Sequence, residues 1–262
     1  MINFLMIGAH PDDMDFRCGG LAILLNRKGH QVRFLSITNG NAGHQSMDRE
    51  ALRIRRAEER YRAGQVYGIP YDTLDENDGY LTADLKTREK LLRYIRRIQP
   101  DVIITHRDCD YHPDHRATGQ LVNDCSYLLR VPLVCQDAPA MSKTPVILSC
   151  EDRFTMPVPF RADIGVACDD VVEQKIQGVL QHESQLYEWL PFDGNWMEIL
   201  QAETREEKTE LLKERHRKRF HGPVEKYPQA FEPGVVYGEV FQINEYGGEI
   251  TEEIRHAMTD RQ

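Results

Sequence analysis

The sequence has no apolar run close to the length of a membrane-spanning helix. Such a helix needs about 20 mostly apolar residues, and charged residues make up 29% of this 262-residue chain. The opening apolar stretch, residues 3–8, is too short for a signal peptide and has no basic residues before it. We therefore expect a cytoplasmic protein without a membrane span.

Paired cysteines are also missing, because none of the six cysteines belongs to a CxxC motif. Two such motifs would be typical of a structural zinc site. A chain of this length can bury a core without disulfides, so reduced thiols in a cytosolic protein are the simpler interpretation. The cysteines are Cys18, Cys109, Cys125, Cys135, Cys150 and Cys168.

Positive charge is in deficit, since the formal net charge is −9. A general nucleic-acid-binding protein needs a basic face that neutralises phosphates. The arginines at residues 53–62 are interleaved with Glu58 and Glu59, which is typical of a salt-bridged helix. No GxGxxG motif follows the first apolar run, which argues against a dinucleotide-binding loop. We expect no nucleic-acid partner.

The first half of the chain alternates short apolar runs with longer amphipathic segments. This alternation predicts a parallel sheet with helices on both faces, an α/β fold of the Rossmann-like kind. The active residues of such sheets lie on loops after the carboxyl ends of strands. The expected strands are residues 3–8, 32–38 and 101–106, and the expected helices are residues 21–28, 49–67, 83–98 and about 114–129.

The second half is less regular. Strands are expected at residues 146–150, 164–167 and 235–243, and helices at 171–185 and 205–220, with an aromatic-rich segment at 186–196 between the helices. No repeat or linker divides the chain. We expect a single domain over residues 1–262, in which residues 1–130 carry the motifs and residues 131–262 complete the sheet and the rim of the substrate site.

Two loops after predicted strands combine histidine, proline and aspartate. The first reads His10-Pro11-Asp12-Asp13 and the second reads His112-Pro113-Asp114-His115. Each alone could be a turn or a helix cap, but together they offer the ligands of a catalytic zinc site, which has three protein ligands and an open position. His10 and Asp13 can point the same way, and either His112 or His115 would complete the set.

These loops resemble the signature of the PIG-L/LmbE-type zinc deacetylases, the family of N-acetylglucosaminyl deacetylases. The resemblance is good from residue 1 to about 130 and patchy afterwards. Further motifs that carry it are Asp15-Phe16-Arg17-Cys18-Gly19-Gly20, Thr38-Asn39-Gly40, Arg55-Arg56-Ala57-Glu58, Asp78-Gly79 and His182-Glu183-Ser184-Gln185. One departure is Asp15, where the family usually has glutamate, and Tyr111 does not match the position of a gating tyrosine in some members.

The resemblance implies a role for each motif residue. It implies that His10, Asp13 and His115 bind Zn²⁺, that Asp12 is the general base and that His112 is the general acid. It further implies that Asp114 orients His112, and that Arg55 and Asp78 contact the substrate. Two other histidines have a structural and a functional reading. His106 is either satisfied by backbone or in contact with substrate, and His182 packs behind the site.

The implied activity is hydrolysis of an N-acetyl amide on an amino sugar or glycoconjugate, which releases acetate and a free amine. Two other functions compete with it. One is a zinc amidase for a non-sugar or thiol-conjugate substrate, and the other is a non-catalytic ligand-binding module. The segment from Trp189 to Trp196 is expected to serve the core or a subunit contact more readily than to stack on sugar rings, and a homo-oligomer is expected.

Overall fold

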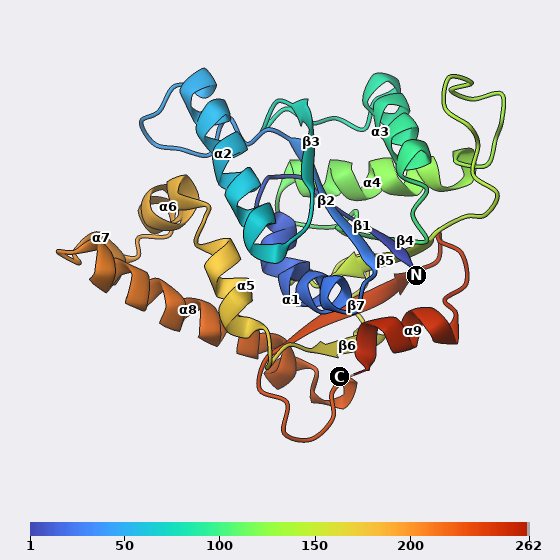
Figure 1. Cartoon of the computed structure of the whole chain (residues 1–262). Coiled ribbons are helices and arrows are strands. Elements are labelled where there is room, and N and C mark those ends of the chain that lie inside the picture. The colour runs from blue at the N-terminus through green and yellow to red at the C-terminus, as the bar shows by residue number, and fades with distance from the viewer. Residues whose placement is uncertain (261–262) are drawn as a thin grey trace.

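The computed structural model describes residues 1–260 and contains a seven-stranded sheet in the order β3-β2-β1-β4-β5-β7-β6 (Figure 1). The strands from β3 to β5 in this order are parallel, whereas β7 runs antiparallel to both of its neighbours. The expected α/β fold with a mainly parallel sheet is therefore confirmed. The strands are β1 (Asn3–Gly8), β2 (Gln31–Thr38), β3 (Tyr71–Glu76), β4 (Val102–Thr105), β5 (Val146–Cys150), β6 (Ile164–Ala167) and β7 (Gly238–Asn244).

The central strand β1 is buried on both faces. Phe4 and Met6 contribute to one apolar cluster, and Leu5 and Ile7 contribute to the cluster on the opposite face. Successive side chains of a strand point to opposite faces, so a strand covered on both sides is apolar throughout, as in other sheets with helices on both faces. This explains why the opening run has no polar alternation.

The helices are divided between the two faces. Side chains of α1, α2 and α9 enter the cluster of Phe4, whereas those of α3 and α4 enter the cluster of Leu5. None of the helices in residues 1–260 is long and apolar enough to cross a bilayer. The helical elements are α1 (Asp13–Arg27), α2 (Arg49–Tyr67), α3 (Leu85–Ile98), α4 (Pro113–Leu128), α5 (Val172–Val179), the π-helix η1 (Ser184–Trp189), α6 (Leu190–Asp193), α7 (Met197–Leu200), α8 (Arg205–Lys226), the 3₁₀-helix η2 (Pro228–Ala230) and α9 (Glu252–Thr259).

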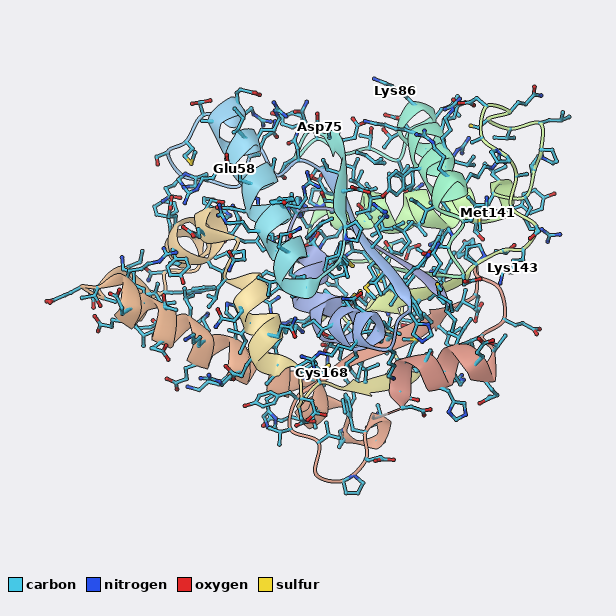
Figure 2. The ribbon with its side chains drawn as sticks, viewed as in Figure 1. Glu58, Asp75, Lys86, Met141, Lys143 and Cys168 are labelled. Atoms are coloured by element: carbon cyan, nitrogen blue, oxygen red, sulfur yellow. The ribbon has the colours of Figure 1, made fainter. Side chains whose placement is uncertain are left out.

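A buried ion pair joins α5 to β7 beneath α1. The Nζ atom of Lys175 lies 2.8 Å from Oε1 of Glu239 and donates to the backbone oxygen of Phe16. The Glu239 carboxylate also accepts hydrogen bonds from the backbone N–H groups of Gly20 and Leu21. A Cβ atom at Gly20 would lie 2.5 Å from the Sγ of Cys168, a residue labelled in Figure 2, so only glycine allows this close packing.

Three elements differ from expectation. Strand β3 was not predicted, because its sequence YDTLDE is largely polar at the edge of the sheet. Helix α1 begins at Asp13, inside the first motif, rather than at residue 21. The helix expected at residues 171–185 ends at Val179, and the π-helix η1 follows from Ser184. The second half nevertheless supplies β5, β6 and β7 to the same sheet.

Candidate active site

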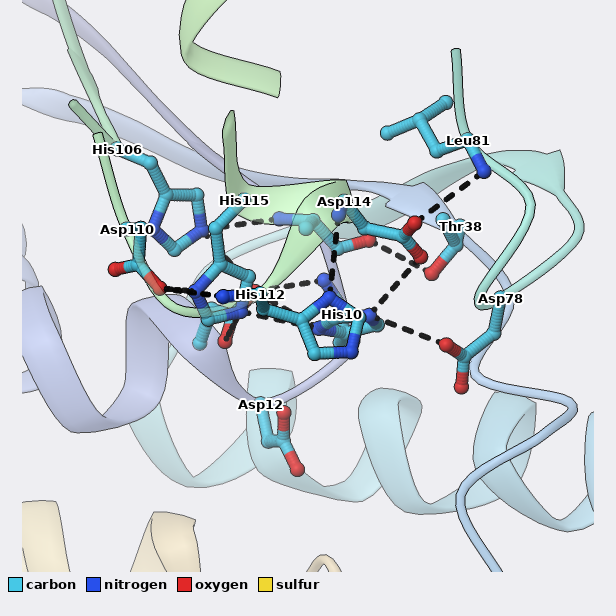
Figure 3. A network of polar contacts seen from close by, with 12 residues as sticks. His10, Asp12, Thr38, Asp78, Leu81, His106, Asp110, His112, Asp114 and His115 are labelled. Carbon is cyan, nitrogen blue, oxygen red and sulfur yellow. Dashed lines mark hydrogen bonds and ion pairs between the residues drawn. The ribbon is translucent and has the colours of Figure 1, made fainter. Parts of the chain in front are cut away.

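The two motif loops meet where the parallel neighbours β1 and β4 end. The first loop leaves β1 at Gly8 and enters α1 at Asp13, and the second enters α4 at Pro113. His112 caps α4, because its Nδ1 atom accepts a hydrogen bond from the backbone N–H of Asp114. Proline in the first turn of a helix has no N–H group that needs a partner. Figure 3 shows the side chains of both loops converging.

The side chains of His10, Asp13 and His115 approach one another within 3.5 Å, and the two histidines face different oxygens of Asp13. The Nε2 atom of His115 lies 3.3 Å from Nδ1 of His10 and 3.2 Å from Oδ1 of Asp13, and Nδ1 of His10 lies 3.5 Å from Oδ2 of Asp13. Tetrahedral ligands with bonds of about 2.0–2.1 Å to zinc are separated by about 3.3–3.4 Å. The spacing therefore fits three ligands of one small cation.

The outer nitrogens of both histidines are occupied by carboxylates. Nε2 of His10 lies 3.2 Å from Asp78 and 3.3 Å from Asp114, and Nδ1 of His115 lies 3.0 Å from Asp110. A carboxylate accepts hydrogen bonds, so it assigns the ring proton to these outer nitrogens. The inner nitrogens are then free to bind a cation, which is the arrangement that carboxylates behind metal-bound histidines produce.

Asp13 is held by the backbone of His10 and lies against the ring of His106. Its Oδ2 atom accepts a hydrogen bond of 2.7 Å from the backbone N–H of His10 and lies 3.1 Å from Nε2 of His106. The His106 ring stacks on His115 with a centroid separation of 4.2 Å, and its Nε2 accepts the backbone N–H of Ala9. His106 thus has the backbone contact expected of it, but it also touches two of the proposed ligands.

The charges of the cluster favour a bound cation or proton. Burial would lower the pKa of His10, but hydrogen bonds to Asp114 and Asp13 raise it well above its ordinary value. Burial also opposes the charge of His115, yet Asp13 and a hydrogen bond to Asp110 raise the pKa of His115 to about 9. Burial would raise the pKa of Asp13, but the positive charge of His115 and the contact with His10 hold it well below its usual range.

Other groupings of possible ligands overlap with this one. His112 could join His10 and His115, and His106 could join Asp13 and His115, since one ligand atom of each lies within 4.8 Å of the others. A third grouping combines His10 with Asp78 and Asp114. This last set uses the outer nitrogen of His10, which faces two carboxylates at hydrogen-bond distance.

Asp12 lies beside the cluster and is held by an arginine. Its Oδ2 atom is 3.1 Å from Nη2 of Arg56, whose side chain is 2% exposed. No hydrogen bond or ion pair is made by the other carboxylate oxygen of Asp12 within residues 1–260, and Figure 3 shows no contact between Asp12 and the histidines. This oxygen is therefore available to a substrate or water molecule.

Arg55 lies on the same helix as Arg56 but pairs with two glutamates, and its contact with a substrate stays a prediction. Its two terminal nitrogens bind Glu188, and its Nε lies 3.3 Å from Glu59. Arg56, the next residue, makes the contact with Asp12 instead. The buried stripe of α2 contains Leu52, Arg56, Glu59, Ala63 and Tyr67. Their spacing of three or four residues is the signal that could have selected Arg56.

Asp114 contacts His10 through its carboxylate and His112 through its backbone N–H group. The Asp114 carboxylate is fully buried and accepts the backbone N–H groups of Gly79 and Leu81 in addition to its contact with His10. Its link to His112 is made by the backbone N–H of Asp114. That bond makes Nδ1 an acceptor, so the neutral His112 ring carries its proton on Nε2.

Asp78 and Tyr111 lie on two sides of the histidines. Asp78 follows β3, is 8% exposed and binds the backbone N–H of Ala42 as well as His10. The Tyr111 ring is 68% exposed and lies edge-on to His112 and His115, with centroid separations of 5.7 and 5.4 Å. Tyr111 thus forms part of the rim.

A buried network joins His182 to Asp15 and to Arg56, the arginine that binds Asp12. Nε2 of His182 lies 2.9 Å from Oδ1 of Asp15, and the hydroxyl of Tyr71 donates to Oδ2 of the same residue. Nδ1 of His182 lies 3.4 Å from Nη1 of Arg56. The shorter side chain of Asp15, where the family usually has glutamate, still reaches both partners, and it lies behind Asp12 rather than among the possible metal ligands.

Comparison with known proteins identifies the family. Residues 5–126, which include both motif loops, match the PIG-L family, described as GlcNAc-PI de-N-acetylase. A diacetylchitobiose deacetylase of Thermococcus kodakarensis is 27% identical over 205 residues, which are 72% of this chain and 73% of the relative. A 4-oxalmesaconate hydratase of Pseudomonas putida is 27% identical over 128 residues, which are 46% of this chain and 50% of the relative.

A solved structure has the same fold. The N,N'-diacetylchitobiose deacetylase of Pyrococcus horikoshii superimposes with a TM-score of 0.74 at 22% identity, covering 93% of this chain and 84% of that chain. Family match and fold agree with the motifs of the two loops. Residues 5–126 thus confirm the resemblance to the PIG-L/LmbE deacetylases, and with it the prediction of an enzyme.

Proposed function

We propose that this enzyme is a zinc-dependent N-deacetylase that hydrolyses the N-acetyl amide of an amino-sugar substrate and releases acetate and a free amine. The observation that carries the proposal is the convergence of His10, Asp13 and His115, in which Nε2 of His115 lies 3.3 Å from Nδ1 of His10 and 3.2 Å from Oδ1 of Asp13. The relative with the longest match, which covers 72% of this chain, is named diacetylchitobiose deacetylase and supports an amino-sugar substrate.

Zinc suits the donor set of two imidazole nitrogens and one carboxylate oxygen. Zinc prefers such ligands, and catalytic zinc sites combine three of them with an open position. When bound, the ion would lower the pKa of water toward about 7 and polarise the amide carbonyl. Asp78, Asp110 and Asp114 would hold the ligand histidines in the orientation that binding requires.

Asp12 and His112 would move the protons of the reaction. We assign Asp12 as the general base, because Arg56 fixes one of its oxygens and the other has no protein partner within residues 1–260. We assign His112 as the general acid, because its ring lies next to that of His10, with a centroid separation of 4.5 Å. It would act as the imidazolium, which gives one N–H proton to the departing nitrogen and becomes the neutral ring, so that the nitrogen leaves as an amine.

Substrate contacts are assigned to Asp78, as the resemblance implies, and we add Arg56, while Arg55 stays a prediction. Both residues are buried next to the proposed reaction centre, where Asp78 contacts His10 and Arg56 contacts Asp12. A hydroxyl or amide group of a sugar could bind the Asp78 carboxylate. Buried polar groups that need partners discriminate strongly against substrates that lack the matching group.

The whole chain is proposed to act as one catalytic domain, since strands of both halves share one sheet. We further propose a cytoplasmic location and a homo-oligomeric state. The location is supported by the cysteines, all of which are free, including Cys18 and Cys150 with sulfur atoms 3.5 Å apart. Free thiols are usual in a reducing compartment.

Elemental analysis of the purified protein together with acetate release from N-acetylated sugars tests the function. We expect one zinc ion per chain, loss of activity after chelation and recovery after zinc is restored. Full activity in the metal-free protein would refute the metal-dependent scheme. N-acylated thiol conjugates and simple acyl amines, tested in parallel, distinguish a sugar deacetylase from a general amidase. An unsaturated carboxylic acid is included as a further substrate, because one relative is named as a hydratase.

A further inference from the structure

The loop between β2 and α2, residues 39–48, is joined to the π-helix η1 by one carboxylate. Oε2 of Glu188, a residue of η1, lies 2.8 Å from Nε2 of His44 in this loop. The same carboxylate accepts hydrogen bonds from both terminal nitrogens of Arg55, in the first half of α2. Glu188 thus holds the loop and the helix that follows it. We call the three side chains the Glu188 clamp.

His44 is oriented to donate a hydrogen bond to Glu188. Its Nδ1 atom accepts the backbone N–H groups of Ser46 and Met47, both at 3.1 Å. The neutral ring therefore carries its proton on Nε2, the atom that faces Glu188. The His44 side chain is 2% exposed, and a hydrogen bond to a charged carboxylate is stronger than one between neutral groups. The clamp needs no added proton to form.

The backbone of the loop also packs directly on η1. Gln185, three residues before Glu188, donates its side-chain N–H to the backbone oxygen of Gly43 at 2.9 Å. A Cβ atom at Gly43 would lie 3.4 Å from Oε1 of Gln185 and 3.6 Å from the Trp189 indole. Both ends of η1 therefore touch the loop, in agreement with the frequent occurrence of π-helical turns near functional sites.

The other side of the loop holds Asp78, which contacts His10. The backbone N–H of Ala42 donates to Oδ2 of Asp78 at 3.3 Å, and the side-chain oxygen of Asn41 accepts the backbone N–H of Asp78 at 3.1 Å. Oδ1 of Asp78 lies 3.2 Å from Nε2 of His10. A continuous series of contacts therefore leads from Glu188 through the loop to a proposed metal ligand.

We propose that Glu188 is a positioning residue for the metal site. Through His44 it holds the loop of residues 39–48, and the loop fixes Asp78 behind His10. The proposal rests on the proposed zinc-dependent function and extends it to a residue outside both motif loops. A carboxylate behind a ligand histidine fixes the orientation of the ring and strengthens metal binding. Asp78 has this effect only while its own position is maintained.

Zinc titrations of single and double variants test the clamp. Glu188→Gln keeps the size of the side chain but removes the charge that binds His44 and Arg55. We expect its zinc affinity, measured against a chromophoric chelator, to fall about twofold to thirtyfold, the range for residues that act through others. Asp78→Asn should weaken zinc binding by itself. Adding Glu188→Gln to Asp78→Asn should cause little further loss, because residues in one series of contacts are not additive.

Glu183→Gln is the matched control. Glu183 lies just before η1, and its side chain is 40% exposed against 36% for Glu188. It also faces two arginines, Arg205 at 3.2 Å and Arg62 at 3.9 Å. The control thus removes the same charge from similar partners without a change in the loop, and zinc affinity should stay the same. His44→Phe should weaken zinc binding as Glu188→Gln does, whereas His44→Gln, which keeps an N–H donor, should weaken it less.

An unchanged zinc affinity in Glu188→Gln, or a loss that adds in full to that of Asp78→Asn, would overturn the positioning role. A wild-type protein that binds no zinc would overturn the proposed function instead. Hydrogen exchange of the metal-free protein then decides the clamp independently. Faster exchange of residues 41–44 and 77–81 in Glu188→Gln than in Glu183→Gln supports it, and equal exchange in the two variants refutes it.

Discussion

The structure gives Asp114 a role that one substitution can test. Its carboxylate is fully buried, and it accepts hydrogen bonds from Gly79, Leu81 and His10. Asp114→Asn preserves the shape of the side chain but replaces one acceptor oxygen with an NH₂ group. Whichever way the amide is turned, its NH₂ group would face the N–H group of Gly79, Leu81 or His10. The variant therefore weakens the support of His10 without removing a proposed ligand.

The expected loss follows from the contacts. At least one charged hydrogen bond disappears, and such a bond contributes about 1.5–3 kcal/mol. A factor of ten in affinity corresponds to about 1.4 kcal/mol. If the loss appears mainly in the metal-bound state, zinc affinity should fall about tenfold to a hundredfold, in agreement with the usual effect of removing a partner behind a metal ligand.

A competition titration with a chromophoric chelator measures the zinc affinity, and turnover at saturating zinc measures the remaining activity. We expect Asp114→Asn to bind zinc more weakly and to recover most of its kcat when the site is filled. Asp48→Asn is the matched control, because Asp48 is an exposed cap of α2 and asparagine caps a helix equally well. It should leave both quantities unchanged.

The opposite pattern would refute this reasoning. If Asp114→Asn bound zinc as tightly as the wild-type enzyme while kcat fell a hundredfold at saturating zinc, Asp114 would act on the general acid His112, as the sequence first suggested. The two roles therefore predict different parameters. The variant could also lose activity because less of it is folded. Circular dichroism detects such a loss, and thermal unfolding with and without zinc distinguishes it from either role of Asp114.

Three further predictions concern the proton-transfer groups and the core. Asp12→Asn and His112→Ala should each lower kcat about 10²- to 10⁴-fold and retain zinc; loss of the metal in elemental analysis would argue against these roles. Lys175→Met should lower the free energy of unfolding, measured by urea titration, by about 3–5 kcal/mol, because Glu239 stays buried without its cation. An unchanged urea midpoint would contradict this prediction. Burial lowers the pKa of His216 to about 3. The unfolded chain binds this proton near pH 6.5, so His216 should lower stability by about 1.4 kcal/mol per pH unit as the pH falls below that value, and His216→Leu should reduce this slope.

The sequence predicts the buried strands better than the edge of the sheet. Strands β1, β2 and β4 are apolar because both of their faces are covered, and this signal is local. Strand β3 is polar at the sheet edge and gives no such signal. The start of α1 was missed for a different reason. Gly20 interrupts the pattern of a helix, and it is accommodated because Glu239, 219 residues away, accepts its N–H group.

For the active site too, the sequence shows local motifs but not long-range contacts. Local motifs and family resemblance select His10, Asp13 and His115, and the side chains of these residues lie close together. The partner of Asp114 could not be found in this way, because Gly79 and Leu81 come from the segment after the unpredicted strand β3. The choice between neighbouring arginines depended on the phase of α2, which the many charged residues of that helix obscure.

The carboxylates around the two histidines explain why the proposed site favours an added positive charge. Asp13, Asp78, Asp110 and Asp114 all contact His10 or His115, and only Asp12 has an arginine of its own. Like charges in a buried cluster raise the free energy of the folded state unless a positive charge is added. Protons can supply that charge, as the raised pKa values of His10 and His115 indicate. A metal must displace these protons, so its affinity should increase with pH. The acidic groups thus favour a divalent ion that binds neutral imidazole.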